Sequence, residues 1–189
     1  MKKLLDRIKL CMLPPPQRRS LPYECYWEDS ILSQEQERIF SNQWLGLGRS
    51  DRLENPGEYE AFELCGQALV LIRNQDKELR LYANTCRHRG AKLLDGTGQC
   101  QAISCPFHGW TYSLDGNLKH AKTMAENSSF DFADNSLIEY KLKELQGFLF
   151  GFLGNTPTDL SNQLGNFSEL HQPWSMNELV TTRRATFEV

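Results

Sequence analysis

The sequence predicts a mainly β, antiparallel fold with a short N-terminal helix, because strand-like runs and hairpin turns fill most of its length. Asp115-Gly116 stands between two short extended runs, and this dipeptide is typical of a tight hairpin turn. Further runs rich in β-branched and aromatic residues are separated by polar turns, which indicates an antiparallel meander. The expected strands cover residues 59–64, 68–73 and 79–83, and the hairpin joins residues 111–114 to the stretch around Leu118.

One helix is expected before the sheet. Ser33 followed by Gln36 matches a capping box, and an apolar helical face that includes Phe40 and Trp44 comes after it. The predicted helix therefore covers residues 33–43.

The later part of the chain predicts a mixture of strand and loop. Residues 147–153 are almost uninterruptedly apolar, which is typical of a strand buried on both faces. We expect a loop over residues 155–173 that contains a short helix at 160–164, and a final strand over residues 179–189.

The first 20 residues form a basic arm with six Lys or Arg against one Asp, a net charge of +5. Its apolar residues recur at helical spacing, and three consecutive prolines, Pro14 to Pro16, follow as a stiff spacer. The arm lacks the continuous apolar stretch and the cleavage site of a secretory signal. We expect three parts: the arm and spacer at 1–20, a folded domain at 21–165, and the start of a connection to a further domain at 166–189.

Composition and charge disfavour several classes of protein. Twenty-one Lys and Arg against 24 Asp and Glu give a net charge of −3, which argues against a general nucleic-acid binder. The longest apolar run, residues 147–154, has eight residues, whereas a membrane-spanning helix needs about 20, so no transmembrane segment is expected. Two of the six cysteines stand next to histidines, which indicates metal binding in a reducing compartment and predicts a cytoplasmic location.

Two tight motifs each combine one cysteine with one histidine. They are Cys86-Arg87-His88 and Cys105-Pro106-Phe107-His108, with 16 residues between His88 and Cys105. One thiolate and one imidazole from each loop suit either a tetrahedral zinc ion or a [2Fe-2S] cluster with two histidine ligands. Zinc fingers usually keep like ligands together, so the spacing favours the binuclear cluster, while a zinc-stabilised binding module without a redox role stays open as an alternative.

These motifs resemble the signature of the Rieske family, Cys-x-His followed by Cys-x-x-His. More narrowly, the chain is similar to the N-terminal Rieske domain of the large (alpha) subunit of Rieske non-haem iron oxygenases, the aromatic-ring-hydroxylating type. The resemblance implies an antiparallel β barrel or sandwich with a small cluster-binding lobe. The residues that carry it are Cys86-Arg87-His88-Arg89-Gly90-Ala91, the run from Cys105 to Tyr112, Asp115-Gly116 with Leu118, and Gly147-Phe148.

The resemblance also implies a ligand set. Cys86 and Cys105 would hold the buried iron of a Rieske [2Fe-2S] cluster, while His88 and His108 would hold the iron nearer the surface. Trp110 is expected to shield the cluster. The loops lack the extra cysteines and the serine donor of the respiratory-chain branch, so we expect a reduction potential in the lower part of the Rieske range of about −150 to +300 mV.

The function that the resemblance implies is electron transfer. Electrons would pass from an NAD(P)H-dependent reductase or a ferredoxin to a mononuclear non-haem iron in a catalytic domain, and a homotrimer is the assembly it suggests. That domain offers a His-x(4)-His pair in the family, but no two of the four histidines here, at 88, 108, 120 and 171, are five positions apart. We therefore expect an oxidoreductase component without a catalytic residue of its own, such as an oxygenase large subunit that stops at its domain boundary; a stand-alone Rieske ferredoxin is the alternative.

Overall fold

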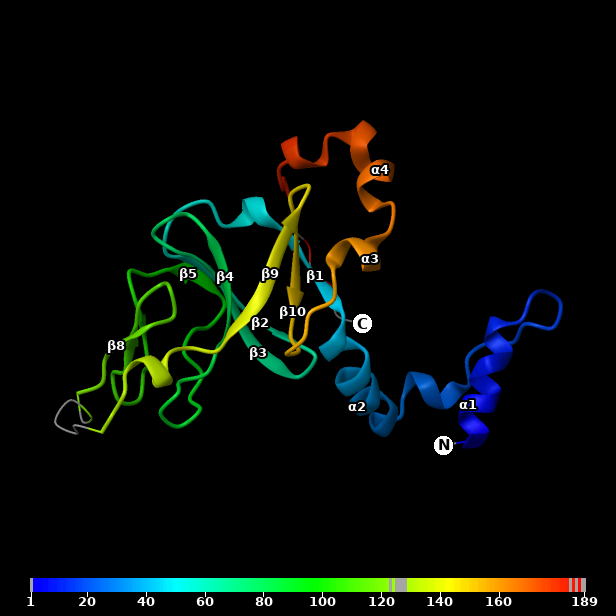
Figure 1. Cartoon of the computed structure of the whole chain (residues 1–189), viewed down its shortest axis with the longest axis horizontal. Coiled ribbons are helices and arrows are strands. Elements are labelled where there is room, and N and C mark those ends of the chain that lie inside the picture. The colour runs from blue at the N-terminus through cyan, green and yellow to red at the C-terminus, as the bar shows by residue number, and fades with distance from the viewer. Residues whose placement is uncertain (1, 123, 125–128, 184, 186, 188–189) are drawn as a thin grey trace. The chain divides into compact units, whose positions relative to one another are not determined.

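The computed structural model describes residues 2–122, 124, 129–183, 185 and 187, in a chain that divides into two compact units, Met1–Ser41 and Asn42–Val189 (Figure 1). The first unit is helical and the second holds every described strand, which confirms a mainly β fold with a short N-terminal helix. Among the helices of the described residues, none combines the length and the apolar character needed to cross a membrane. The domain boundaries expected at residues 21 and 165 stay predictions.

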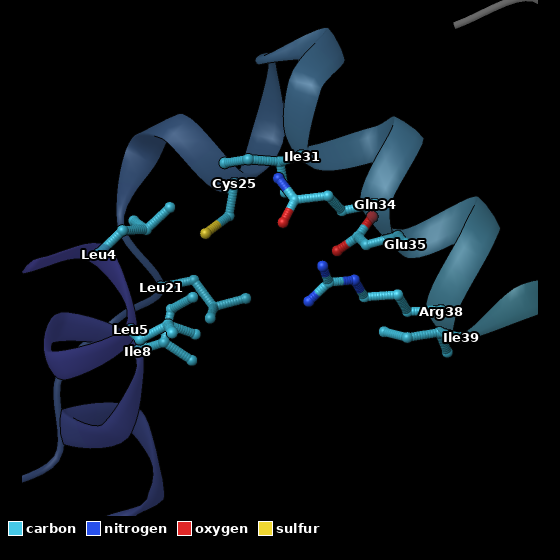
Figure 2. A pocket seen from close by; sticks show the side chains of 10 residues that line it. All are labelled: Leu4, Leu5, Ile8, Leu21, Cys25, Ile31, Gln34, Glu35, Arg38 and Ile39. Carbon is cyan, nitrogen blue, oxygen red and sulfur yellow. The ribbon is translucent and has the colours of Figure 1, made fainter. Parts of the chain in front are cut away.

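The first unit contains the helices α1 (Lys2–Lys9) and α2 (Asp29–Arg38) with short 3-10 turns between them. The described residues of α2 include no buried side chain. Apolar side chains of both helices instead line an open pocket of about 380 Å³. In Figure 2, Leu4, Leu5 and Ile8 of α1 face α2 across this pocket.

The predicted helix at 33–43 is wrong at both ends, since α2 begins four residues earlier and ends at Arg38. The expected capping box is not formed. The Ser33 hydroxyl lies inside the helix and donates a hydrogen bond to the Asp29 carbonyl oxygen at 2.8 Å, the back-bonding that serine makes in helix interiors. Glu28 stands at the N-terminal end without a side-chain cap.

The second unit is built on a seven-stranded antiparallel sheet with the strand order β1-β10-β9-β4-β3-β2-β5. The meander β2-β3-β4 is confirmed, with each boundary within one residue of the prediction. The strand bounds are β1 Trp44–Arg49, β2 Glu58–Leu64, β3 Gln67–Arg73, β4 Leu79–Ala83, β5 Thr97–Gln99, β9 Glu139–Leu145 and β10 Phe148–Phe152.

A smaller three-stranded sheet, β6 (Ile103–Ser104), β7 (Thr111–Tyr112) and β8 (Leu118–His120), carries the predicted hairpin. Its turn is closed by the Gly116 N–H, which donates to the Ser113 carbonyl oxygen at 2.9 Å. The two helices that follow the large sheet are α3 (Leu160–Leu164), which matches the predicted short helix, and α4 (Phe167–His171).

The central strand β3 is buried on both faces and separates two cores. On one face, Val70 and Ile72 pack in the cluster of side chains that includes Cys86, Cys105 and Trp110. On the other, leucines of β3 pack with leucines of β1, β4 and β10. The small sheet and the two Cys/His loops are therefore supported directly by the middle of the large sheet.

Three strands of the large sheet were not predicted: β1, β5 and β9. β1 contains two glycines and a β-bulge between Gly46 and Gly48, which interrupt the alternation of apolar residues. β9 is rich in Lys and Glu, yet its sequence E-Y-K-L-K alternates with a period of two, and its burial alternates accordingly. The signal for β9 was therefore present in the sequence.

The strand predicted over residues 179–189 is wrong for the described part of that range, which contains no strand. Side chains rather than a neighbouring strand bind its backbone. The Arg49 guanidinium donates to the carbonyl oxygens of Met176 and Leu179, and the Asp51 carboxylate accepts the Thr181 N–H. Residues 184, 186, 188 and 189 lie outside the described residues.

We expect Gly57→Ala to lower the free energy of unfolding by about 2 to 4 kcal/mol. Gly57 has a φ of +85°, and a Cβ atom there would lie 2.1 Å from the Cys100 carbonyl oxygen. Urea unfolding followed by circular dichroism measures the loss. Gly46→Ala is the matched control because Gly46 has open space around it; equal effects of the two substitutions would contradict the prediction.

We expect acid to release the segment around Thr181 from Asp51. Burial alone would raise the pKa of Asp51, but hydrogen bonds from Thr181 and Arg49 outweigh it and hold that pKa below its usual value. Ionised Asp51 thus stabilises the contact above the ordinary aspartate pKa of about 3.9, and this contribution disappears as the pH falls through the lower native pKa. The chemical shift of the Thr181 amide should change with pH around that midpoint. This pH dependence should be absent in Asp51→Ala and unchanged in the control Asp76→Ala.

Candidate metal centre

The first Cys/His loop follows β4 and closes on itself through two backbone hydrogen bonds. The Cys86 N–H donates to the Ala91 carbonyl oxygen at 2.8 Å, and the Gly90 N–H donates to the Cys86 carbonyl oxygen at 2.9 Å. Gly90 has a φ of +73°, a left-handed conformation that favours glycine. The loop thereby holds the side chains of Cys86 and His88 on a short, closed frame.

The second loop connects β6 to β7 and repeats this frame. The Cys105 N–H donates to the Trp110 carbonyl oxygen at 2.7 Å, and the Gly109 N–H donates to the Cys105 carbonyl oxygen at 3.1 Å. Gly109 has a φ of +68°. The histidine stands two residues after the cysteine in the first frame and three residues after it in the second, so two alike backbone frames present the same pair of side chains.

Two fully buried asparagines brace these loops against the large sheet. The Asn84 side chain donates to the Leu94 carbonyl oxygen at 2.7 Å and accepts the Leu94 N–H at 3.0 Å, which fixes the chain on both sides of the first loop. The Asn74 side chain donates to Asp115 at 2.9 Å and accepts the Glu78 N–H at 2.8 Å. Because buried amides are costly unless they are hydrogen-bonded, both side chains fix one geometry.

The four predicted ligand side chains divide into an inner and an outer pair. Cys86 and Cys105 are only 3% and 4% exposed, whereas His88 is half-buried and His108 is exposed. The rings of the two histidines lie edge to face, with centroids 4.9 Å apart. The structure therefore brings all four side chains into one lobe, with the thiols toward the core and the imidazoles toward solvent.

The outer pair carries a feature that fits a bound metal group. The Nδ1 atom of His88 is buried and has no hydrogen-bond partner among the described residues. Burial, and after it the neighbouring charges of Arg89 and His108, lowers the pKa of His88 and favours the neutral imidazole that a metal requires. Two buried thiols and a buried imidazole nitrogen without a partner supply three of the four donors that a [2Fe-2S] cluster with two histidine ligands needs, and His108 is the candidate for the fourth.

Tyr112, which the sequence analysis missed as a functional residue, lies fully buried behind the first loop. Its hydroxyl accepts the Arg87 N–H at 3.0 Å and lies 3.3 Å from the Cys86 sulfur. Since its oxygen already accepts a hydrogen bond, its own proton is available to the sulfur. Burial, followed by the Cys86 contact, raises the pKa of Tyr112, so the hydroxyl stays protonated as a donor.

Trp110 lies where the expected shielding residue should lie. Its indole is 2% exposed and stacks on the His88 ring, with centroids 4.8 Å apart and an interplanar angle of 13°. Phe130 meets the indole edge to face, and Phe132 packs against Phe130 in the same way. This aromatic series closes the lobe beneath His88.

The other cysteines and histidines lie outside the two loops, although Cys100 packs against the core cluster that contains Cys86 and Cys105. His120 is on β8, and the His171 ring hydrogen-bonds the Phe167 carbonyl oxygen within α4. The cysteines are unpaired. Within the described ranges, no three or more His, Cys, Asp or Glu side chains surround a common point as ligands of a single metal ion.

Comparison with known proteins gives the family. The model of the Rieske [2Fe-2S] domain matches residues 43–141, which include both loops, the small sheet and the large sheet up to the start of β9. The chain belongs to the Rieske [2Fe-2S] domain family.

Curated relatives refine this membership. The carnitine monooxygenase oxygenase subunit of Escherichia coli is 34% identical over 151 residues, which are 79% of this chain and 40% of the relative. The glycine betaine monooxygenase oxygenase subunit of Chromohalobacter salexigens is 28% identical over 162 residues, 85% of this chain and 36% of the relative. The benzene 1,2-dioxygenase alpha subunit of Pseudomonas putida is 29% identical over 142 residues, covering 74% and 32%. The Rieske chain thus spans about two fifths or less of these relatives' lengths.

Solved structures agree with the fold. The apo form of a quaternary ammonium Rieske monooxygenase superposes with a TM-score of 0.79 at 32% identity, over 85% of this chain and 48% of that one. A Rhodococcus naphthalene 1,2-dioxygenase gives a TM-score of 0.76 at 24% identity, over 90% and 38%, and supports the fold alone.

These matches confirm the predicted resemblance to the Rieske domain of oxygenase alpha subunits, and they identify the cofactor as a Rieske-type [2Fe-2S] cluster. The iron-sulfur cluster is therefore favoured over the zinc ion that the spacing alone left open. When bound, the cluster supplies a centre that accepts and releases one electron. The inner thiols and the outer imidazoles are the groups that would hold it, and the Tyr112 hydroxyl would lie beside one of its sulfur ligands.

We expect Tyr112→Phe to lower the reduction potential of the holoprotein by about 40 to 60 mV, because loss of a hydrogen bond worth about 1 kcal/mol destabilises the more negative, reduced state. An EPR-monitored redox titration measures this. Tyr140→Phe is the control, since its hydroxyl donates at 2.6 Å to Gln67 in the large sheet. An unchanged potential in Tyr112→Phe would show that the hydroxyl does not donate to the sulfur.

Proposed function

We propose that this chain is the electron-transfer part of a Rieske oxygenase. It accepts electrons from an NAD(P)H-dependent reductase or a ferredoxin and passes them to a mononuclear non-haem iron that other residues hold. The division of the site into buried thiols and an exposed imidazole carries this proposal, because it gives the cofactor one edge at the surface while the protein covers the rest.

The ligand assignment is part of the proposal. Cys86 and Cys105 hold the inner iron, and His88 and His108 hold the outer one. The burial of both thiols and the unpartnered His88 Nδ1 atom support it. The matching backbone frames support it further, because each contributes one cysteine and one histidine, as a binuclear centre requires.

The relatives favour an oxygenase component over a stand-alone ferredoxin, since those named above are oxygenase subunits or alpha subunits. Two of them are named for carnitine and glycine betaine, so we infer that the catalytic partner of this domain belongs to the quaternary ammonium type. Homotrimeric assembly and a cytoplasmic location complete the proposal.

We expect the anaerobically purified chain to contain two irons and two acid-labile sulfides, and to give a rhombic EPR signal after reduction with dithionite. His88→Ala and Cys105→Ser should each abolish the signal and the visible absorption, because each removes one of four ligands. His120→Ala is the control, since it removes a histidine on β8 outside both loops.

Two results would contradict this proposal. A colourless protein with one zinc would reject the redox function, and retained Rieske absorption in His88→Ala would reject the ligand assignment.

A further inference from the structure

The first compact unit contains a loop with an unusual composition. We define the proline loop as residues 9–19, which begin at the last residue of α1, and in Figure 1 it is the blue loop at the end of that helix. The loop contains three Lys or Arg and no Asp or Glu, a net charge of +3, in a chain that carries −3. The proline loop is therefore a cationic segment of an anionic protein.

The tip of the proline loop is apolar and faces solvent. Residues 10–16, with the sequence L-C-M-L-P-P-P, contain no charged side chain. Met12 is 82% exposed, and Leu10, Leu13 and the three prolines are exposed as well. Single apolar side chains on a surface are common, but a continuous run of this kind is typical of a contact surface.

The backbone of the tip is bonded within the loop. The Leu10 carbonyl oxygen accepts the N–H groups of Leu13 at 3.4 Å and Arg19 at 3.2 Å, and the Gln17 N–H donates to the Pro14 carbonyl oxygen at 3.1 Å. Prolines have no N–H group. Each backbone N–H from Leu13 to Gln17 is thus either absent or paired inside the loop. Because unpaired N–H groups are costly away from water, such a turn loses little when lipid replaces water around it.

Two arginines lie at the base of this tip. The Arg18 guanidinium donates to the Leu13 carbonyl oxygen at 2.9 Å, and the Arg19 guanidinium donates to the Pro16 carbonyl oxygen at 3.4 Å. These bonds hold both side chains beside the apolar residues. Their acceptors are neutral, so the positive charge of both groups remains, and each guanidinium has more N–H groups than these bonds use.

The third cation of the loop is held only weakly by the protein. The Lys9 ammonium lies 3.7 Å from the Asp6 carboxylate, and both side chains are largely exposed. An exposed pair of this kind contributes little to stability, so another anion can compete for the lysine. All three cations of the proline loop can therefore meet an anionic surface.

An anionic lipid bilayer matches these features together. Segments that bind at the bilayer surface place apolar side chains at the boundary between headgroups and acyl chains, and their cations attract anionic lipids. A nucleic acid would engage the cations and leave Met12 in water. The internally bonded backbone also favours lipid, because a protein surface can supply backbone hydrogen-bond partners and hydrocarbon cannot.

We propose that the proline loop binds the surface of an anionic lipid bilayer. Met12 and Leu13 enter the boundary between headgroups and acyl chains, while Lys9 and the two arginines pair with lipid phosphates. The attachment is peripheral and reversible, and no covalent bond forms or breaks. It goes beyond the proposed electron-transfer function and does not depend on a cluster in the second unit.

The test is flotation of the full chain with vesicles of phosphatidylcholine alone or mixed with an equal part of phosphatidylglycerol. The chain should bind the mixed vesicles at an ionic strength of about 0.01 M, bind the neutral ones little, and bind less at about 0.15 M. Replacing Arg18 and Arg19 by glutamine should lower the partition coefficient about 20-fold, since each basic residue contributes about fivefold. Replacing both by lysine keeps the charge and should retain most of the binding.

The control for charge is the double variant Lys119→Gln with Lys141→Gln. It removes the same two positive charges at exposed positions on β8 and β9 of the second unit. Its binding to the mixed vesicles should stay close to that of the wild type. An equal loss in both double variants would assign the attraction to net charge and overturn the role of the proline loop.

The apolar contact is tested by Met12→Ser, which should lower binding to the mixed vesicles about tenfold. Met12→Leu keeps an apolar side chain and should bind like the wild type. Because Met12 is 82% exposed, neither change removes a packed side chain, and circular dichroism of each variant checks the fold.

Three results would overturn the proposal. They are no binding to the mixed vesicles at low salt, equal binding to both kinds of vesicle, and binding that the loop variants leave unchanged. Retention of the chain by immobilised polyglutamate without any binding to vesicles would assign the cations to an acidic protein surface, which also overturns it.

Discussion

The pair of closed backbone frames at the metal centre is the constraint on which the rest of the structure depends. Each frame needs a cysteine whose N–H and carbonyl oxygen are both engaged within the loop, and a glycine with positive φ that turns the chain back. This leaves the cysteine side chain facing the core and the histidine facing outward. Neither frame contains a helix or a strand, so its position has to come from the elements to which it is attached.

The large sheet provides that position. β4 leads directly into the first loop, and β3 places Val70 and Ile72 beneath the thiols. The buried side chains of Asn84 and Asn74 then fix the lobe at one position on the sheet. An amide whose oxygen and nitrogen are both hydrogen-bonded tolerates little displacement. The hairpin at Gly116 shows the same coupling, since a Cβ atom there would lie 2.7 Å from the Tyr82 ring of β4. At Gly116, the contact between lobe and sheet thus leaves no room for a larger side chain.

The sequence predicted what depends on local pattern. Motif spacing located the four candidate ligands, and alternation with turn residues located β2 to β4 and the hairpin. The sequence-based prediction failed where a tertiary contact determines the local structure. β1 forms a strand despite its two glycines because it pairs with β10. The segment near Thr181 is bound by Arg49 and Asp51 and forms no strand. Tyr112 was missed for the same reason, since nothing near it in the sequence shows that its hydroxyl reaches Cys86, 26 residues earlier.

The electrostatics of the lobe connect the inner and outer halves of the site. A cluster held in this lobe would gain one negative charge on reduction, which is unfavourable beside buried groups unless donors or cations lie close by. Tyr112 supplies a donor from the core side, and Arg87 and Arg89 supply positive charge from the solvent side. The two arginines and Tyr112 would therefore favour the reduced centre from opposite sides.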